Sequence, residues 1–140
     1  MPSELSVRAS YRGEMHVTGF AREHAIEMDY PIRPEGMAGA TPLELLLVSL
    51  AGCAGNAVAL LLKRSSQPVA SLEVNASGHR RDEHPTVITD IALEFVVRGS
   101  GIDEAVVKRV VSRAEEHICP VWAMLRPGTP IRSSVRIEQA

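Results

Sequence analysis

The sequence predicts an α+β fold in which antiparallel or mixed sheets pack on a long central helix. Three observations predict it. Apolar and polar residues alternate both before and after the middle of the chain, which is typical of half-buried strands. The middle itself is one long apolar segment with a helix start signal, and a second amphipathic segment follows the later strands. Clustered strands separated by long helices favour α+β, and the length of 140 residues suits a single domain, 1–140.

The N-terminal strands are expected within about residues 1–30. Alternation there is weak, and the segment 12–14 carries a turn signal, so we expect two or three strands in a meander. Residues 31–40 hold two prolines and two glycines and are predicted to form a loop.

The central helix is predicted over about residues 42–63. Thr41 can cap the free N–H groups, and Pro42 fits the first helical position because its missing N–H would be unpaired anyway. Glu44 stands three residues after Thr41, where its carboxylate can reach back to the N–H of the cap.

This helix is apolar all round, and two interpretations compete. Its length could span a bilayer, or it could be a core helix that is covered on every side. We favour the core, because alternating strands on both sides of the segment need cover. Small or polar residues also stand near its middle: Ser49, Gly52, Gly55 and Asn56.

The second half of the chain predicts two strands, two helices and a last strand. The first strand alternates at Leu72 and Val74 and turns at Gly78, and the second runs through 91–97. A helix is expected over 102–117, and a short helix starts at Pro120. The last strand contains the apolar residues Ile131, Val135 and Ile137.

Composition restricts the partners and cofactors. The 15 basic and 17 acidic residues give a net charge of −2, and aromatic residues are scarce, so we expect neither nucleic acid nor a membrane as partner. The N-terminus shows no secretory signal, which predicts a cytoplasmic protein. Two cysteines without CxxC or HxxxH spacing predict no metal site, and nothing indicates another cofactor.

The two cysteines are the main candidates for chemistry. Cys53 lies within the apolar helix, either as an inert buried thiol or as one made accessible by the glycines around it. Cys119 precedes a helix, where it could act as a simple cap or as a thiol whose pKa is lowered by free N–H groups. Glu44 lies about 13 Å along the helix from Cys53, on the opposite face. Arg12 and Arg33 stand in or beside loops, where a guanidinium could stabilise a thiolate and orient a peroxide oxygen.

These residues together resemble a known family. The segments Thr41–Leu47, Ala51–Cys53 and His117–Val121 are similar to those of the OsmC/Ohr family, the osmotically inducible protein C and organic hydroperoxide resistance proteins. The form of the helix start, in which Glu44 follows Pro42 by two residues, is closer to that of the family's less characterised subgroup. The resemblance implies an OsmC-like α+β fold and an intertwined homodimer.

The resemblance also implies an activity, oxidative stress defence by a cysteine-based thiol peroxidase that reduces organic hydroperoxides. Cys53 would be the peroxidatic thiol and Cys119 the resolving thiol, and an external dithiol would reduce their disulfide. In the better characterised branch a glutamate follows the proline directly, whereas here Leu43 stands there and Glu44 comes next. Arg12 could take the place of the activating arginine. The alternative is a non-catalytic dimer that binds a hydrophobic small molecule at its interface.

Overall fold

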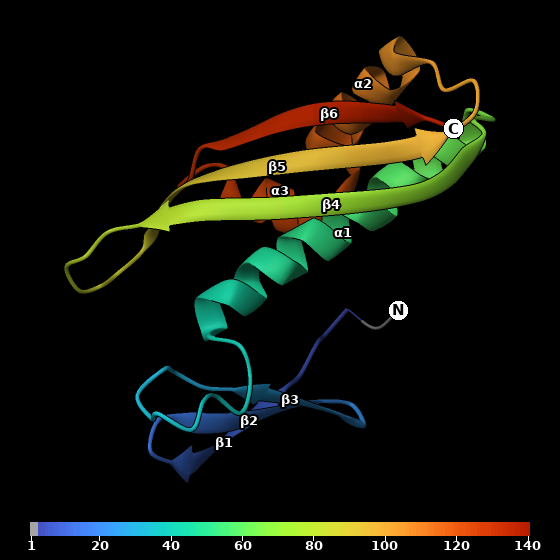
Figure 1. The fold of residues 1–140 in the computed structure, drawn as a ribbon. Coiled ribbons are helices and arrows are strands. Elements are labelled where there is room, and N and C mark those ends of the chain that lie inside the picture. Colours follow the sequence, from blue (N-terminus) through green and yellow to red (C-terminus); the bar gives the residue numbers. More distant parts are fainter. Residues whose placement is uncertain (1–2) are drawn as a thin grey trace. The chain divides into compact units, whose positions relative to one another are not determined.

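The structure is a computed structural model that describes residues 3–140 (Figure 1). The chain divides into two compact units, one that ends at Leu46 and one that comprises Leu47–Ala140. The mixture of helices with two three-stranded sheets confirms the predicted α+β class.

The first unit is built on an antiparallel meander. Its strands are β1 (Arg8–Gly13), β2 (His16–Ala21) and β3 (His24–Met28), paired in the order β1-β2-β3. The loop after β3 returns to it, because Ala40 bridges to Met28.

The central helix, α1 (Pro42–Arg64), begins with the predicted capping box. The N–H of Thr41 donates to Oε1 of Glu44 at 2.9 Å, and the N–H of Glu44 donates to Oγ1 of Thr41 at 3.2 Å. Two N–H groups that the helix leaves free are thereby paired. Lys63 and Arg64 occupy the last turn, where cations complement the helix dipole.

The second unit contains a mixed sheet. Its strands are β4 (Val69–Arg80), β5 (Ile88–Gly99) and β6 (Ile131–Gln139), in the order β4-β5-β6. β4 and β5 pair antiparallel, and β5 and β6 pair parallel. The turn predicted at Gly78 is wrong: Gly78 pairs with Ile91 inside the sheet, and β4 continues to Arg80, because the backbone pairing with β5 extends beyond the glycine.

The predicted helix over 102–117 divides into two elements. α2 (Glu104–Arg113) starts later than expected, because Asp103 caps it by accepting from the N–H of Ala105 at 3.0 Å. A π-helical turn, η1 (Ala114–Ile118), follows it directly, and α3 (Pro120–Leu125) comes next.

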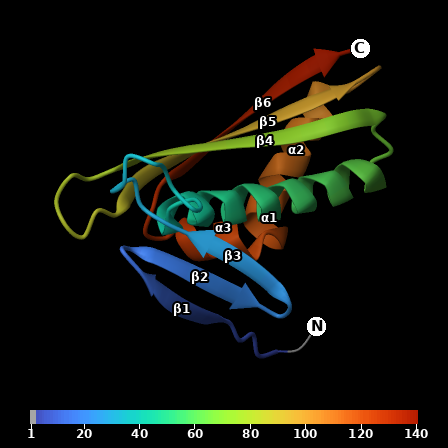
Figure 2. The same ribbon diagram turned by 60° about the horizontal axis from the view of Figure 1, so that its bottom comes forward.

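The helices of the second unit cover one face of the sheet. Figures 1 and 2 show α1, α2 and α3 on the same side of β4, β5 and β6. Alternate residues of the central strand β5 point into this core. The largest fully buried side chains include Trp122, Phe95, Leu50, Leu62, Ile91 and Leu93.

The opposite face of the sheet carries ion pairs across its strands. Arg98 pairs with Glu138 and, at 3.3 Å, with Glu73. Arg136 pairs with Glu94 at 3.4 Å and with Glu138 at 2.9 Å. One face of the sheet is therefore apolar and packed, and the other is polar, as expected for a sheet covered by helices on one side.

α1 is not covered all round, which corrects the sequence prediction. Its core side is buried in the second unit, but Val48 is 62% exposed and Leu60 is 43% exposed. We call the exposed face of α1 the α1 stripe; it comprises Val48, Ser49, Gly52, Asn56, Ala59, Leu60 and Lys63. By length and hydropathy α1 could also cross a membrane, but core helices of soluble proteins pass the same test.

Candidate functional site

Cys53 lies midway along α1, between the core and the α1 stripe. Its side chain is partly buried and packs against the core cluster of the second unit. On a helix of 3.6 residues per turn, Cys53 stands about 100° from Ala54 on the core side and about 100° from Gly52 in the stripe. The side chain therefore lies at the border between the buried and the exposed sides of α1.

Cys119 is fixed by the backbone on both sides. As predicted, it is the N-cap of α3 with Pro120 first in the helix, and its Sγ accepts from the N–H of Trp122 at 3.5 Å. Its own N–H donates to the carbonyl of Ala114 at 2.9 Å, which closes the π turn. π turns are rare and occur frequently at functional sites.

An aromatic pair lies in the same buried core cluster as this thiol. Trp122 stacks on Phe95 with ring centroids 6.2 Å apart and an angle of 15° between the rings. Both side chains are fully buried, and Cys119 is only 2% exposed. Within residues 3–140, Nε1 of Trp122 is the buried side-chain nitrogen or oxygen that lacks a hydrogen-bond partner.

The pKa of Cys119 is raised to about 11. Burial is the largest cause, and a side-chain hydrogen bond to Cys53 is the next. The backbone N–H groups of Trp122 and Val121 act in the opposite direction but are outweighed. Of the two alternatives for Cys119, the thiol with a lowered pKa is therefore wrong, because the loss of water around the sulfur outweighs the contribution of the free N–H groups.

The structure thus brings the two cysteines together as free thiols with different surroundings. Cys53 is the more accessible of the two. Cys119 is buried and protonated at neutral pH, and it shares a side-chain hydrogen bond with Cys53. Such a pair contains an accessible sulfur beside a second thiol that can later combine with it.

The raised pKa of Cys119 predicts a specific pH dependence. In a Cys53→Ser variant, the absorbance of the Cys119 thiolate at 240 nm should appear only above pH 9.0, the ordinary thiol value. Burial persists in this variant and favours the protonated thiol. Because the unfolded thiol ionises first, the stability that the buried, protonated thiol contributes is complete below pH 9.0 and is lost as the pH rises above this value. Ionisation of the Cys119 thiol near pH 7 would contradict the raised pKa.

Glu44 is occupied by the capping box. Hydrogen bonds from Thr41, first from its backbone N–H, hold the pKa of Glu44 below its usual value. Its carboxylate therefore has a structural function that needs no contact with Cys53.

Arg33 is held within the first unit by a buried carboxylate. It pairs with Asp29, whose side chain is fully buried, and donates to the carbonyl of Glu14 at 2.7 Å. The N–H of Ala38 is the main reason that the pKa of Asp29 is lowered, and the N–H of Tyr30 and the charge of Arg33 act in the same direction. Arg33 thereby fixes the loop after β3.

Arg12 lies on the first sheet. Its Nε donates to Oγ1 of Thr18 at 3.1 Å, and its guanidinium stands 5.9 Å from the centre of the Phe20 ring. Thr18 in turn donates to Glu27 at 2.7 Å. A role of Arg12 or Arg33 in activating Cys53 stays a prediction.

Sequence reasoning missed three residues of these sites. Trp122 and Phe95 form a stacked pair in the core cluster that contains Cys119, and Asp29 is the partner of Arg33. The only tryptophan of the chain directly follows the Cys-Pro-Val segment, and this signal in the sequence could have indicated Trp122. Across residues 3–140, no three His, Cys, Asp or Glu side chains gather closely enough to hold a metal ion.

Comparisons with known proteins identify the family of this chain. The family model described as OsmC-like protein matches residues 34–134. Protein YhfA of Escherichia coli K12 is 32% identical over 120 residues, which are 86% of this chain and 87% of that protein. A hypothetical protein from Aquifex aeolicus has a similar structure, with a TM-score of 0.87, 27% identity and 99% of each chain covered. The organic hydroperoxide resistance protein OhrB of Bacillus subtilis shares the fold at a TM-score of 0.67 and 21% identity, over 95% of this chain and 98% of that one. The chain belongs to the OsmC-like protein family.

Proposed function

We propose that this protein is a thiol peroxidase that reduces organic hydroperoxides, with Cys53 as the peroxidatic and Cys119 as the resolving thiol. The pairing of a partly exposed cysteine with a buried, protonated one is the observation that carries the proposal. Membership of the OsmC-like family supports it, as does the likeness in fold to a protein named for organic hydroperoxide resistance.

The proposed cycle has three balanced steps. The Cys53 thiolate attacks the O–O bond of the peroxide, the alkoxide leaves and takes a proton as alcohol, and Cys53 becomes a sulfenic acid. The Cys119 thiol then displaces the hydroxyl group as water, which forms a disulfide between the two residues. An external dithiol reduces the disulfide through thiol exchange and is itself oxidised. The cycle requires a reducing compartment, and we propose the cytoplasm.

Apolar surroundings favour an organic substrate. Cys53 is flanked on its core side by Leu50, Ala54 and Ala57, which are buried aliphatic residues. An alkyl or aryl group on the peroxide can bury apolar surface beside them, and hydrogen peroxide has no such group.

Steady-state peroxide consumption tests this proposal. The reduced protein with dithiothreitol should consume cumene hydroperoxide at a rate proportional to protein concentration, and hydrogen peroxide more slowly. Consumption no faster than that of dithiothreitol alone would contradict the proposal.

We further propose a homodimer in which the α1 stripe packs against a second copy. The stripe exposes Val48 and Leu60 together with small residues. A Cβ atom added at Gly52 would meet no atom within 4 Å in this chain, so a neighbouring backbone has room to approach there. Small residues on a helix face permit such close approach.

The variant Gly52→Leu separates dimerisation from folding. Leucine fits the open space at this position and has a better helix propensity than glycine, so the single chain should stay folded. Light scattering should give twice 15.2 kDa for the wild type and a shift toward 15.2 kDa for the variant. A monomeric wild-type protein would contradict the proposed dimer.

One observation favours the alternative, a non-catalytic dimer that binds a hydrophobic molecule. Glu44 and Arg33 are both occupied by structural partners within the first unit and its helix cap. The reagent DTNB distinguishes the two functions. A native Cys53 that reacts within minutes supports the peroxidase, whereas two thiols that react only after denaturation support the binding protein.

A further inference from the structure

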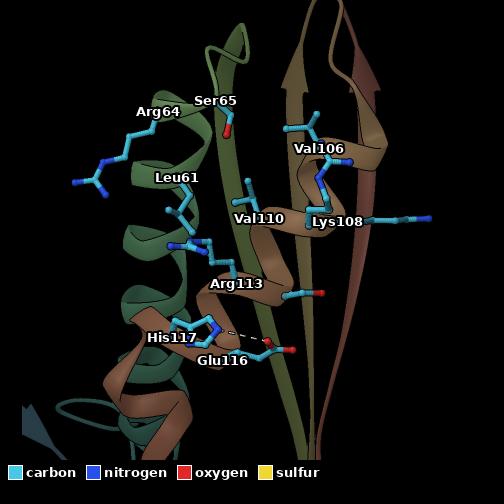
Figure 3. Close-up of a pocket in the computed structure, with 11 residues that line it drawn as sticks. Leu61, Arg64, Ser65, Val106, Lys108, Val110, Arg113, Glu116 and His117 are labelled. Carbon is cyan, nitrogen blue, oxygen red and sulfur yellow. Dashed lines mark ion pairs between the residues drawn. The ribbon is translucent and has the colours of Figure 1, made fainter.

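An open groove of about 770 Å³ lies between the last turn of α1 and the segment formed by α2 and η1 (Figure 3). It is separate from the cysteine pair. Leu61, at its wall, follows Cys53 by eight residues, which is about 12 Å along the helix axis. Neither cysteine lines the groove.

Three arginines line this groove without a partner. Arg64 extends from α1, and Arg109 and Arg113 stand one turn apart on α2; in Figure 3, Arg113 reaches from α2 toward α1. Among the described residues, none of the three has a carboxylate within ion-pair distance or a side-chain hydrogen bond. The groove has one carboxylate, Glu116, which stands 3.7 Å from His117.

This accumulation of positive charge is unusual for the molecule. The chain as a whole has a net charge of −2, and on the outer face of the sheet Arg98 and Arg136 are each paired with glutamates. Like charges one helical turn apart, as at Arg109 and Arg113, repel each other and destabilise the helix. A bound anion would remove this repulsion and give both guanidinium groups a hydrogen-bonding partner.

The floor of the groove is apolar. Leu61 and Val110 are buried beneath it, and the partly buried Val106 continues the same surface. The volume lies within the range of small-molecule sites, which combine an apolar lining with a few polar groups that fix orientation. The arrangement suits a ligand with one anionic end and an apolar body.

The proposed dimer leaves this groove open on its α1 side. At about 100° per residue, Leu61 lies near the centre of the core side of α1, opposite the α1 stripe, whereas Arg64 lies about 40° from Leu60 at the edge of the stripe. A second copy that packs on the stripe therefore leaves Leu61 uncovered and meets Arg64 only at the edge of the contact.

We propose that the groove binds an amphipathic anion, a carboxylate or phosphate group carried on an apolar chain. Arg109 and Arg113 hold the anionic group from α2, and the aliphatic floor takes the apolar chain. This assignment is independent of the thiol chemistry, because binding requires neither cysteine nor a peroxide.

Calorimetric titration of the reduced full-length protein with decanoate at low salt tests the assignment. We expect saturable binding of one decanoate per chain, with Arg109→Gln/Arg113→Gln weakening it at least about tenfold, since hydrogen bonds to charged groups contribute this much or more. The matched control is Arg80→Gln/Arg81→Gln, which makes the same charge change at the other end of β4. It should bind like the wild type, and so should Cys53→Ser.

Two further probes sharpen the result. Decyl phosphate should compete with decanoate, and the tighter of the two identifies the preferred anionic group. Decanol has the same chain without a charge and should bind at least tenfold more weakly. Equal binding of decanol, equal binding by Arg109→Gln/Arg113→Gln, or no saturable binding of either anion would overturn the proposal. Because all four substituted arginines are exposed, circular dichroism should show native folding in both variants.

Discussion

Replacement of Cys53 by serine should abolish the consumption of cumene hydroperoxide. The rate should fall at least about a thousandfold, to that of dithiothreitol alone, because removal of the nucleophile disables the catalytic unit as a whole. Serine keeps the size of the side chain at this partly buried position, so the fold should persist. The measurement is the rate of peroxide loss at fixed protein concentration.

The matched variant is Cys119→Ser, which removes the resolving thiol and keeps the nucleophile. One equivalent of peroxide should still oxidise Cys53, and the mass should rise by about 16 Da as sulfenic acid forms. Normal turnover by Cys53→Ser, or loss of the first oxidation in Cys119→Ser, would contradict the assigned roles.

Replacement of Trp122 by alanine should cause the largest loss of stability among single changes near the site. Its side chain is fully buried and stacks on Phe95, so truncation leaves a large cavity beside Cys119. We expect the free energy of unfolding to fall by about 3–5 kcal/mol, measured by urea denaturation. The unpartnered Nε1 reduces the loss somewhat, because its burial without a hydrogen bond is itself unfavourable.

Met124→Ala is the control for this change. Met124 lies in the same short helix but is 79% exposed, so its truncation should change the free energy of unfolding by no more than about 0.5 kcal/mol. Equal effects of the two substitutions would show that the stacked pair does not anchor α3 to the sheet.

Local signals in the sequence were sufficient for the helix termini. The capping box at Thr41 and Glu44 and the start of α3 at Pro120 depend on residues within one turn of each other, and the structure has both. Gly78 shows the limit of such signals. Glycine permits a turn but does not require one, and the pairing of β4 with β5 decides that the strand continues.

Properties that depend on burial could not be predicted. A helix N-terminus lowers the pKa of a nearby thiol in water, but in the folded chain Cys119 lies in a core cluster to which distant residues such as Phe95 contribute, and its burial reverses the direction. The exposed α1 stripe is a similar case. Its apolar sequence indicated cover on all sides, and the residues that would cover it are not in the second unit of this chain.

The most direct test of the proposed chemistry is the intact mass of the reduced protein after one equivalent of cumene hydroperoxide. The peroxidase assignment predicts a loss of about 2 Da and of both thiols that DTNB counts after denaturation, as Cys53 and Cys119 form a disulfide. Hydrogen peroxide should produce the same change more slowly. An unchanged mass with two retained thiols would contradict the assignment and leave an OsmC-like fold without this chemistry.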